Sequence, residues 1–158
     1  MIYTEDLGQS FAHAKNELLK PGMLTLHEAG ELIRRAALEL GFIPISEHQV
    51  PSKITESGFR YVDWVWCDPD TRSIVAAFEI EGADCPASTV DKDIDSLGDL
   101  DCLFKFVFLY QARKDGVLGC KEAMGTRVTD LRDKGIKAVY DIEMMAGGMK
   151  ALIHEIKE

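Results

Sequence analysis

The sequence lacks any apolar stretch that approaches about 18 consecutive residues, the length from which a membrane-spanning helix is expected. Its first residues, MIYTEDLGQS, are acidic, whereas a secretory signal begins with basic residues and continues with apolar ones. We therefore expect a cytoplasmic protein with no membrane partner.

Positive charge is also scarce, because 18 Lys and Arg residues stand against 27 Asp and Glu residues and leave a net charge of −9. Such a charge repels a phosphate backbone at long range and disfavours a protein that simply coats DNA. The exception is the segment 113–137, where seven basic and four acidic residues give a local charge of +3. This segment is either a solvated helix or a basic face that contacts nucleic acid.

Cysteine and histidine are few and scattered. The four cysteines form no CxxC pair, and no histidine lies at the spacing of a zinc ligand. The string from His27 to Glu31 is similar to a zinc-protease helix motif, but that chemistry needs a second imidazole one turn later, and position 31 is Glu. The sequence therefore predicts reduced thiols and no zinc site.

What the composition does provide is enough apolar material for a core, with 46% hydrophobic and 28% charged residues. The length of 158 residues suits one domain. We predict a single domain over 1–158, with an N-terminal helix over 1–22, a core over about 25–110 and a C-terminal helix-strand-helix segment over 113–158.

The hydrophobic pattern predicts strands framed by helices. Apolar residues at three- and four-residue spacing predict a helix that begins after Thr25 and ends at Gly41, and a second helix between 89 and 100 links two strands as a crossover. β-branched and aromatic residues predict strands over 42–50, 59–67, 73–81 and 104–110. This order predicts an α/β fold with a mixed central β-sheet flanked by helices.

Two carboxylates share one face of the third predicted strand. The two-residue period of a strand places Glu79 and Glu81 on the same side. A hairpin with the preceding strand sets Asp63 opposite Glu79 and Tyr61 opposite Glu81, with Cβ atoms about 4.5 to 5.5 Å apart. Like charges so close require a raised pKa or a neutralising cation, and a divalent ion such as Mg²⁺ takes carboxylate oxygens. The alternative is an edge hairpin whose acids point into solvent.

The arrangement resembles a known nuclease motif. Asp63, then fifteen residues, then Glu79-Ile80-Glu81, on a hairpin between two helices, resembles the PD-(D/E)XK nuclease superfamily, which has the restriction-endonuclease-like fold. The resemblance covers about residues 25–110 and implies an αβββαβ core. In that family the first acid and the (D/E) residue bind Mg²⁺, so the resemblance implies Asp63 and Glu79 as ligands of Mg²⁺ or Mn²⁺.

This sequence departs from the family at two positions. Val62 stands where the family often has Pro, and Glu81 occupies the position of the motif Lys. Some restriction enzymes of the superfamily carry Glu there and remain active, whereas others recruit a Lys from a neighbouring element. Lys92 in the following helix and Lys105 on the next strand are the candidates, and each is otherwise an ordinary surface lysine.

The family also often places a Glu of its first core helix near the metal. Glu31 fits this position best and Glu28 is next. Both residues could equally be solvated acids on the surface of the helix.

The resemblance implies a metal-dependent nuclease that hydrolyses phosphodiester bonds of DNA with an activated water, and a homodimer if both strands are cut. Its expected catalytic residues are Asp63, Glu79, Glu81, Lys92 and Lys105, with Glu31 as an additional metal ligand. Two other functions stay open. The missing Lys favours a non-catalytic binding or regulatory module of the same fold, and the net charge of −9 favours an acidic inhibitor or immunity protein that binds a basic partner.

Overall fold

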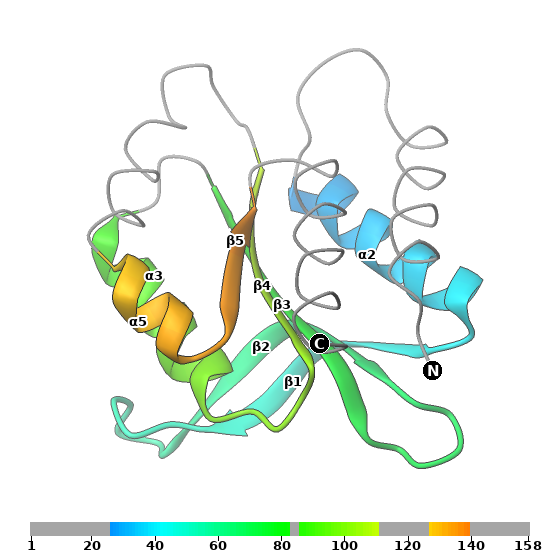
Figure 1. Ribbon diagram of the computed structural model, residues 1–158, viewed down its shortest axis with the longest axis horizontal. Coiled ribbons are helices and arrows are strands. Elements are labelled where there is room, and N and C mark those ends of the chain that lie inside the picture. The colour runs from blue at the N-terminus through cyan, green and yellow to red at the C-terminus, as the bar shows by residue number, and fades with distance from the viewer. Residues whose placement is uncertain (1–25, 83–85, 111–126, 140–158) are drawn as a thin grey trace, which may run out of the picture.

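The computed structural model describes residues 26–82, 86–110 and 127–139 (Figure 1). Parts of the predicted chain lie outside the described residues. These are the helix predicted over 1–22 and, in the predicted C-terminal helix-strand-helix segment, residues 113–126 and the final helix. The described ranges hold most of the predicted core and the whole of the acidic strand pair.

The described strands form one five-stranded sheet in the order β1-β2-β3-β4-β5. The first three strands pair antiparallel, whereas β4 pairs with β3 and β5 pairs with β4 in parallel. The strands are β1 (Ile43–Pro51), β2 (Phe59–Cys67), β3 (Ile74–Gly82), β4 (Phe104–Tyr110) and β5 (Ile136–Val139). The α/β fold with a mixed central sheet, as the sequence predicts, is confirmed.

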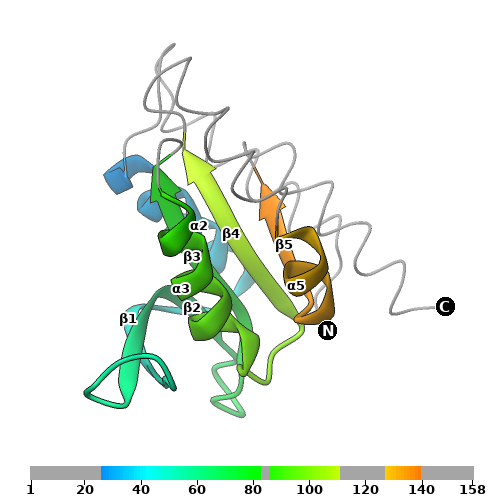
Figure 2. The ribbon, with the colours of Figure 1, turned by 90° about the vertical axis from the view of Figure 1, so that its left-hand side faces the viewer.

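Helices cover both faces of this sheet (Figures 1 and 2). The helix α2 (Leu26–Leu40) packs on one face, and α3 (Ala87–Gly98) and α5 (Val128–Asp133) pack on the other. From α2 to β4 the element order is therefore α-β-β-β-α-β. No helix among the described residues is long and apolar enough to cross a membrane.

The core beneath α2 is built from one helical stripe and alternate strand residues. Small and branched side chains of α2 repeat at helical spacing and contact Trp66 and Phe78 on the sheet. Three phenylalanines at alternate positions of β4 pack on this face, which makes the sheet side strongly aromatic. The buried residues of the stripe are Ala29, Leu32, Ile33, Ala36 and Ala37, and the phenylalanines are Phe104, Phe106 and Phe108.

The core beneath α3 uses the other set of strand residues. Ala77 of β3 and Val107 of β4 pack there with Val90 and Leu97 of α3. The next residue on this face of β3 is Glu79, so the apolar layer continues directly into a carboxylate. The fold therefore places the acids of β3 beneath a helix, and the interpretation of them as solvent-facing acids of an edge hairpin is wrong.

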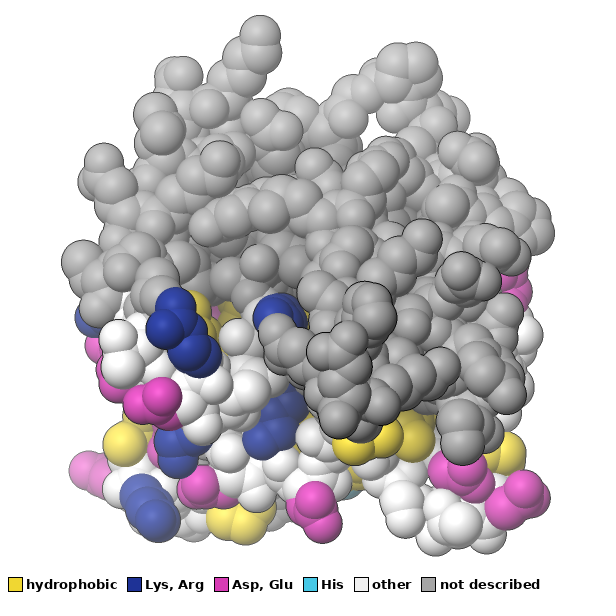
Figure 3. Space-filling model, viewed as in Figure 1, with side chains coloured by type: hydrophobic (Ala, Val, Ile, Leu, Met, Phe, Trp, Pro, Cys, Tyr) yellow, Lys and Arg dark blue, Asp and Glu magenta, His cyan; other side chains and the backbone are white. Residues whose placement is uncertain are grey.

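Ion pairs join α5 to α3. Arg127 binds Asp91, and Nζ of Lys134 lies 3.5 Å from Oδ1 of Asp99. Figure 3 shows the basic and acidic side chains of the described residues interspersed on the face that it views. Much of the basic segment 113–137 lies outside the described residues, and its role in binding nucleic acid stays a prediction.

Candidate metal centre

The hairpin between β2 and β3 opens at Asp63. The sequence predicts that the ladder between β2 and β3 continues to Asp63 and Glu79, but the ladder ends at Trp64 and Phe78. In place of the next ladder bond, Oδ2 of Asp63 accepts a hydrogen bond from the backbone N–H of Ile80 at 2.7 Å. The predicted backbone pairing of Asp63 with Glu79 and of Tyr61 with Glu81 is wrong, since neither pair belongs to the ladder between β2 and β3, and Tyr61 is 53% exposed.

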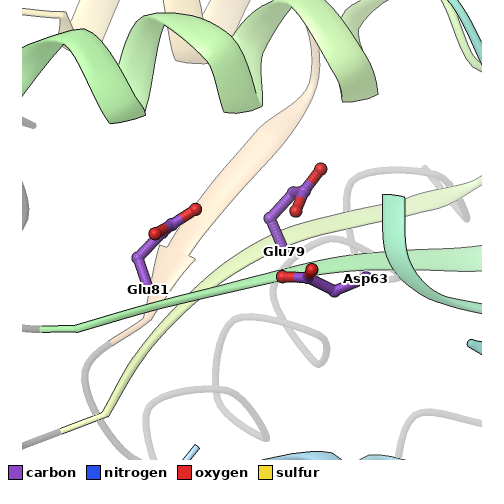
Figure 4. Close-up of side chains that lie close together, drawn as sticks. All are labelled: Asp63, Glu79 and Glu81. Carbon is purple, nitrogen blue, oxygen red and sulfur yellow. The ribbon is translucent and has the colours of Figure 1, made fainter. Parts of the chain in front are cut away.

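Despite this opening, the predicted carboxylates meet in space. One carboxylate oxygen from each of Asp63, Glu79 and Glu81 lies within 4.8 Å of the others. Figure 4 shows Glu79 and Glu81 on the same side of β3, rising toward the helix above, with Asp63 beside them. Three oxygens at this separation, two of them on one strand, could hold a metal ion.

Glu79 is the most buried acid of the three, with 3% of its surface exposed. Burial, followed by the charge of Asp63 and a hydrogen bond with its carboxyl group, raises the pKa of Glu79 to about 10. Its Oε1 is buried and has no hydrogen-bond partner within the described part of the chain. A buried carboxylate oxygen without a donor is costly, and a cation would satisfy it.

A fourth acid, Asp93 of α3, adjoins the group. It is 1% exposed, and its carboxyl group is hydrogen-bonded to that of Glu81. Burial, then this hydrogen bond and the charge of Glu79, raise the pKa of Asp93 to about 11. Asp93 is not among the residues predicted from the sequence, although it lies three residues after Val90 and four before Leu97, within the apolar stripe of the helix.

Two basic residues act on the carboxylates. Burial raises the pKa of Glu81, and the charges of Arg60 and Lys92 oppose this rise. Arg60 also lowers the pKa of Glu79, and its guanidinium donates to the backbone carbonyl of Lys92 and lies 3.9 Å from Oδ2 of Asp95. Lys92 is among the residues predicted from the sequence and Arg60 is not, because nothing in the strand pattern of β2 shows that the side chain of Arg60 reaches the site.

The other two sequence-selected residues lie apart from this group. Nζ of Lys105 donates to the carbonyl oxygen of Gly98 at 3.1 Å, at the end of α3, and Lys105 pairs with Ala77, two residues before Glu79. Glu31 is on α2, the helix on the opposite face, where its carboxylate binds Arg34 at 2.8 Å. Glu31 is therefore not a member of the acidic group among the described residues, and the ammonium group of Lys105 is bound at the end of α3.

A pocket of about 200 Å³ opens beside Asp63. Glu47, on its wall, adopts a φ of 54°, a left-handed conformation that residues other than glycine rarely adopt and that is enriched at functional sites. The residues that line the pocket are Ser46, Glu47, Asp63, Trp64 and Ile80. Asp63 is therefore the acid of the group that lines this pocket, whereas Trp64 and Ile80 on its wall belong to the core beneath α2.

Comparison with known proteins gives no assignment, because no family model, no curated protein and no solved structure significantly matches the chain.

Proposed function

We propose that this protein is a divalent-metal-dependent nuclease that hydrolyses phosphodiester bonds of DNA. The observation that carries the proposal is the Oε1 atom of Glu79, a buried carboxylate oxygen without a hydrogen-bond partner in a group of three acids whose oxygens lie within 4.8 Å. Such a group suits a hard cation such as Mg²⁺ or Mn²⁺.

The place of these acids in the fold supports the same proposal. They lie on the second and third strands of an α-β-β-β-α-β order, which is the order that the resemblance to the PD-(D/E)XK nucleases implies. The hairpin opens at Asp63, and the adjacent pocket would let a phosphate group approach this acid.

The roles of the residues follow from their positions. Asp63 and Glu79 would hold the cation, which when bound supplies a Lewis acid and lowers the pKa of a bound water. Glu81 would orient or deprotonate the attacking water. Arg60 and Lys92 are the basic residues that act on Glu81, and they would balance the charge that develops on the phosphoryl group.

The test is whether the purified protein nicks supercoiled plasmid DNA in Mg²⁺ or Mn²⁺. We expect nicking by the wild type, none in EDTA, and loss of activity in Asp63→Asn. Asp70→Asn is the matched control, because Asp70 is an exposed acid in the turn between β2 and β3. Equal nicking by wild type and Asp63→Asn would refute the proposal.

A second candidate is a non-catalytic metal-binding module of the same fold. The observation that favours it is the position of Lys105. Its Nζ donates to the carbonyl oxygen of Gly98 at 3.1 Å, at the end of α3, so Lys105 does not replace the motif Lys that Glu81 substitutes. This module would bind Mn²⁺ and would not cut DNA under any of the conditions above.

A further inference from the structure

The helix α3 brings a carboxylate of its own to the acids of β3. Val90 and Leu97 of α3 are fully buried against the sheet, and Asp93 lies between them on the same stripe. Its carboxyl group therefore faces the acid-bearing side of β3 and is hydrogen-bonded to Glu81. A carboxylate in an apolar helix stripe is costly unless it has a partner that compensates its burial.

The four acids form two hydrogen-bonded pairs. Glu79 is paired with Asp63, and Asp93 is paired with Glu81. Each pair has one buried oxygen without a partner in the described residues, Oε1 of Glu79 and Oδ2 of Asp93, and these two residues are 3% and 1% exposed. A cation could therefore satisfy an unpartnered oxygen at each of two places, one at Glu79 and one at Asp93.

From this geometry we propose that the site takes two divalent cations, the second held between Glu81 and Asp93. This inference rests on the proposed metal centre and adds a ligand from α3 that the nuclease resemblance does not supply. Two cations also balance four carboxylates, and in two-metal sites the ions lie about 3.5 to 4 Å apart and clamp the attacking and leaving oxygens. Glu81 and Asp93 would then be the ligands of the second ion, beside Asp63 and Glu79 as ligands of the first.

The basic residues near the group do not replace a second cation. Arg60 is already engaged by the carbonyl of Lys92 and by the carboxylate of Asp95. Lys92 is exposed on α3, whereas Asp93 next to it is buried. Neither basic residue therefore pairs with the buried Oδ2 of Asp93 in the described residues, and a cation among the acids could bind this oxygen.

The experiment is the stoichiometry of Mn²⁺ binding, measured by titration calorimetry on the full chain. We expect two ions per chain in the wild type and one in Asp93→Asn, a substitution that keeps the size of the side chain and a hydrogen-bond donor toward Glu81. Asp101→Asn, which changes an exposed acid just beyond α3, is the matched control and should bind two.

A measurement on the wild type alone covers the case in which Asp93→Asn does not fold. At two equivalents of Mn²⁺, the electron paramagnetic resonance spectrum should show a coupled ion pair, and a spectrum of isolated ions would overturn the inference. One ion in the wild type, or two in Asp93→Asn, would also overturn it. If one ion binds and plasmid is still nicked, the second cation is refuted while the nuclease proposal stands; if no ion binds, both fail.

Discussion

At the scale of single residues, burial separates Glu79 from most acids of the chain. Most other described acids are exposed or half-buried, whereas Glu79 lies under α3 with Asp63 and Glu81 as its neighbours. In the metal-free protein its pKa of about 10 keeps it protonated at neutral pH. The unfolded chain releases this proton near the ordinary pKa of 4.5, so Glu79 makes folding less favourable as the pH rises.

Glu79→Gln should therefore stabilise the metal-free protein at pH 8 and change little at pH 4. Between about pH 4.5 and 10 the native state holds one more proton than the unfolded state, which costs up to about 1.4 kcal/mol of unfolding free energy per pH unit. Denaturant unfolding in EDTA at several pH values measures this slope. Parallel curves for wild type and variant would contradict the raised pKa.

Glu81→Ala tests the residue that stands at the position of the motif Lys. Loss of a group that orients or deprotonates water typically lowers the rate by about 10² to 10⁴. We expect this loss in plasmid nicking, with Mn²⁺ still bound through Asp63 and Glu79. If Glu81→Ala nicks plasmid as fast as the wild type while Asp63→Asn is inactive, Glu81 has no role in the mechanism, and Lys92 becomes the leading candidate for its role.

At the scale of elements, the close approach of α2 to β2 depends on a glycine within the helix. A Cβ atom on Gly30 would lie 3.2 Å from Nε1 of Trp64, closer than an ordinary contact. Trp64 also lines the pocket beside Asp63. The absence of a side chain at position 30 therefore lets the helix pack against the strand that carries the first acid.

Gly30→Val should destabilise the protein by about 1 to 3 kcal/mol, because the added methyl groups press on Trp64 and the buried helix has little freedom to move. Leu38→Val is the control for a β-branched residue at an exposed position of the same helix; by helix propensity alone Gly30→Val would be favourable, so a loss of stability at position 30 reports the packing against Trp64. Denaturant midpoints of the three proteins provide the comparison. Equal effects of the two substitutions would show that α2 does not pack tightly at Gly30.

At the scale of the whole molecule, the net charge of −9 and the group of buried acids both favour the binding of cations and disfavour the binding of phosphate. Negative charge attracts cations and repels phosphate, so a metal ion bound at the acidic group would lessen the repulsion that a DNA strand meets there. The ion would also stabilise the fold, because it binds the assembled acids and not the separated ones of the unfolded chain.

Millimolar Mn²⁺ should therefore raise the melting temperature relative to EDTA. An ion at 100 times its dissociation constant adds about 2.7 kcal/mol to the unfolding free energy. Asp63→Asn should reduce this shift, whereas Asp70→Asn, in the exposed turn, should keep it. Identical thermal melts of the wild type in Mn²⁺ and EDTA would count against a shared carboxylate site.

The sequence by itself was enough to predict most helices and strands of the described residues and to select Asp63, Glu79 and Glu81. Helical and strand periods are local properties, so they predicted α2 and the strands to within one residue at most ends, and they placed Glu79 and Glu81 on one face. The nuclease function and the family stay predictions. The distance in sequence between Asp63 and Glu79 also suited a hairpin, which the structure forms as far as Trp64.

Only the tertiary structure decided what surrounds those acids. Three features depend on how one element packs on another. The ladder ends at Asp63, the charge of Arg60 acts on Glu81, and Asp93 is hydrogen-bonded to Glu81. The same packing directs Lys105 to the end of α3 and leaves Glu31 on the opposite helix layer. Local periodicity gives the face of an element but not its neighbour, because contacts between elements are fixed by the assembled core.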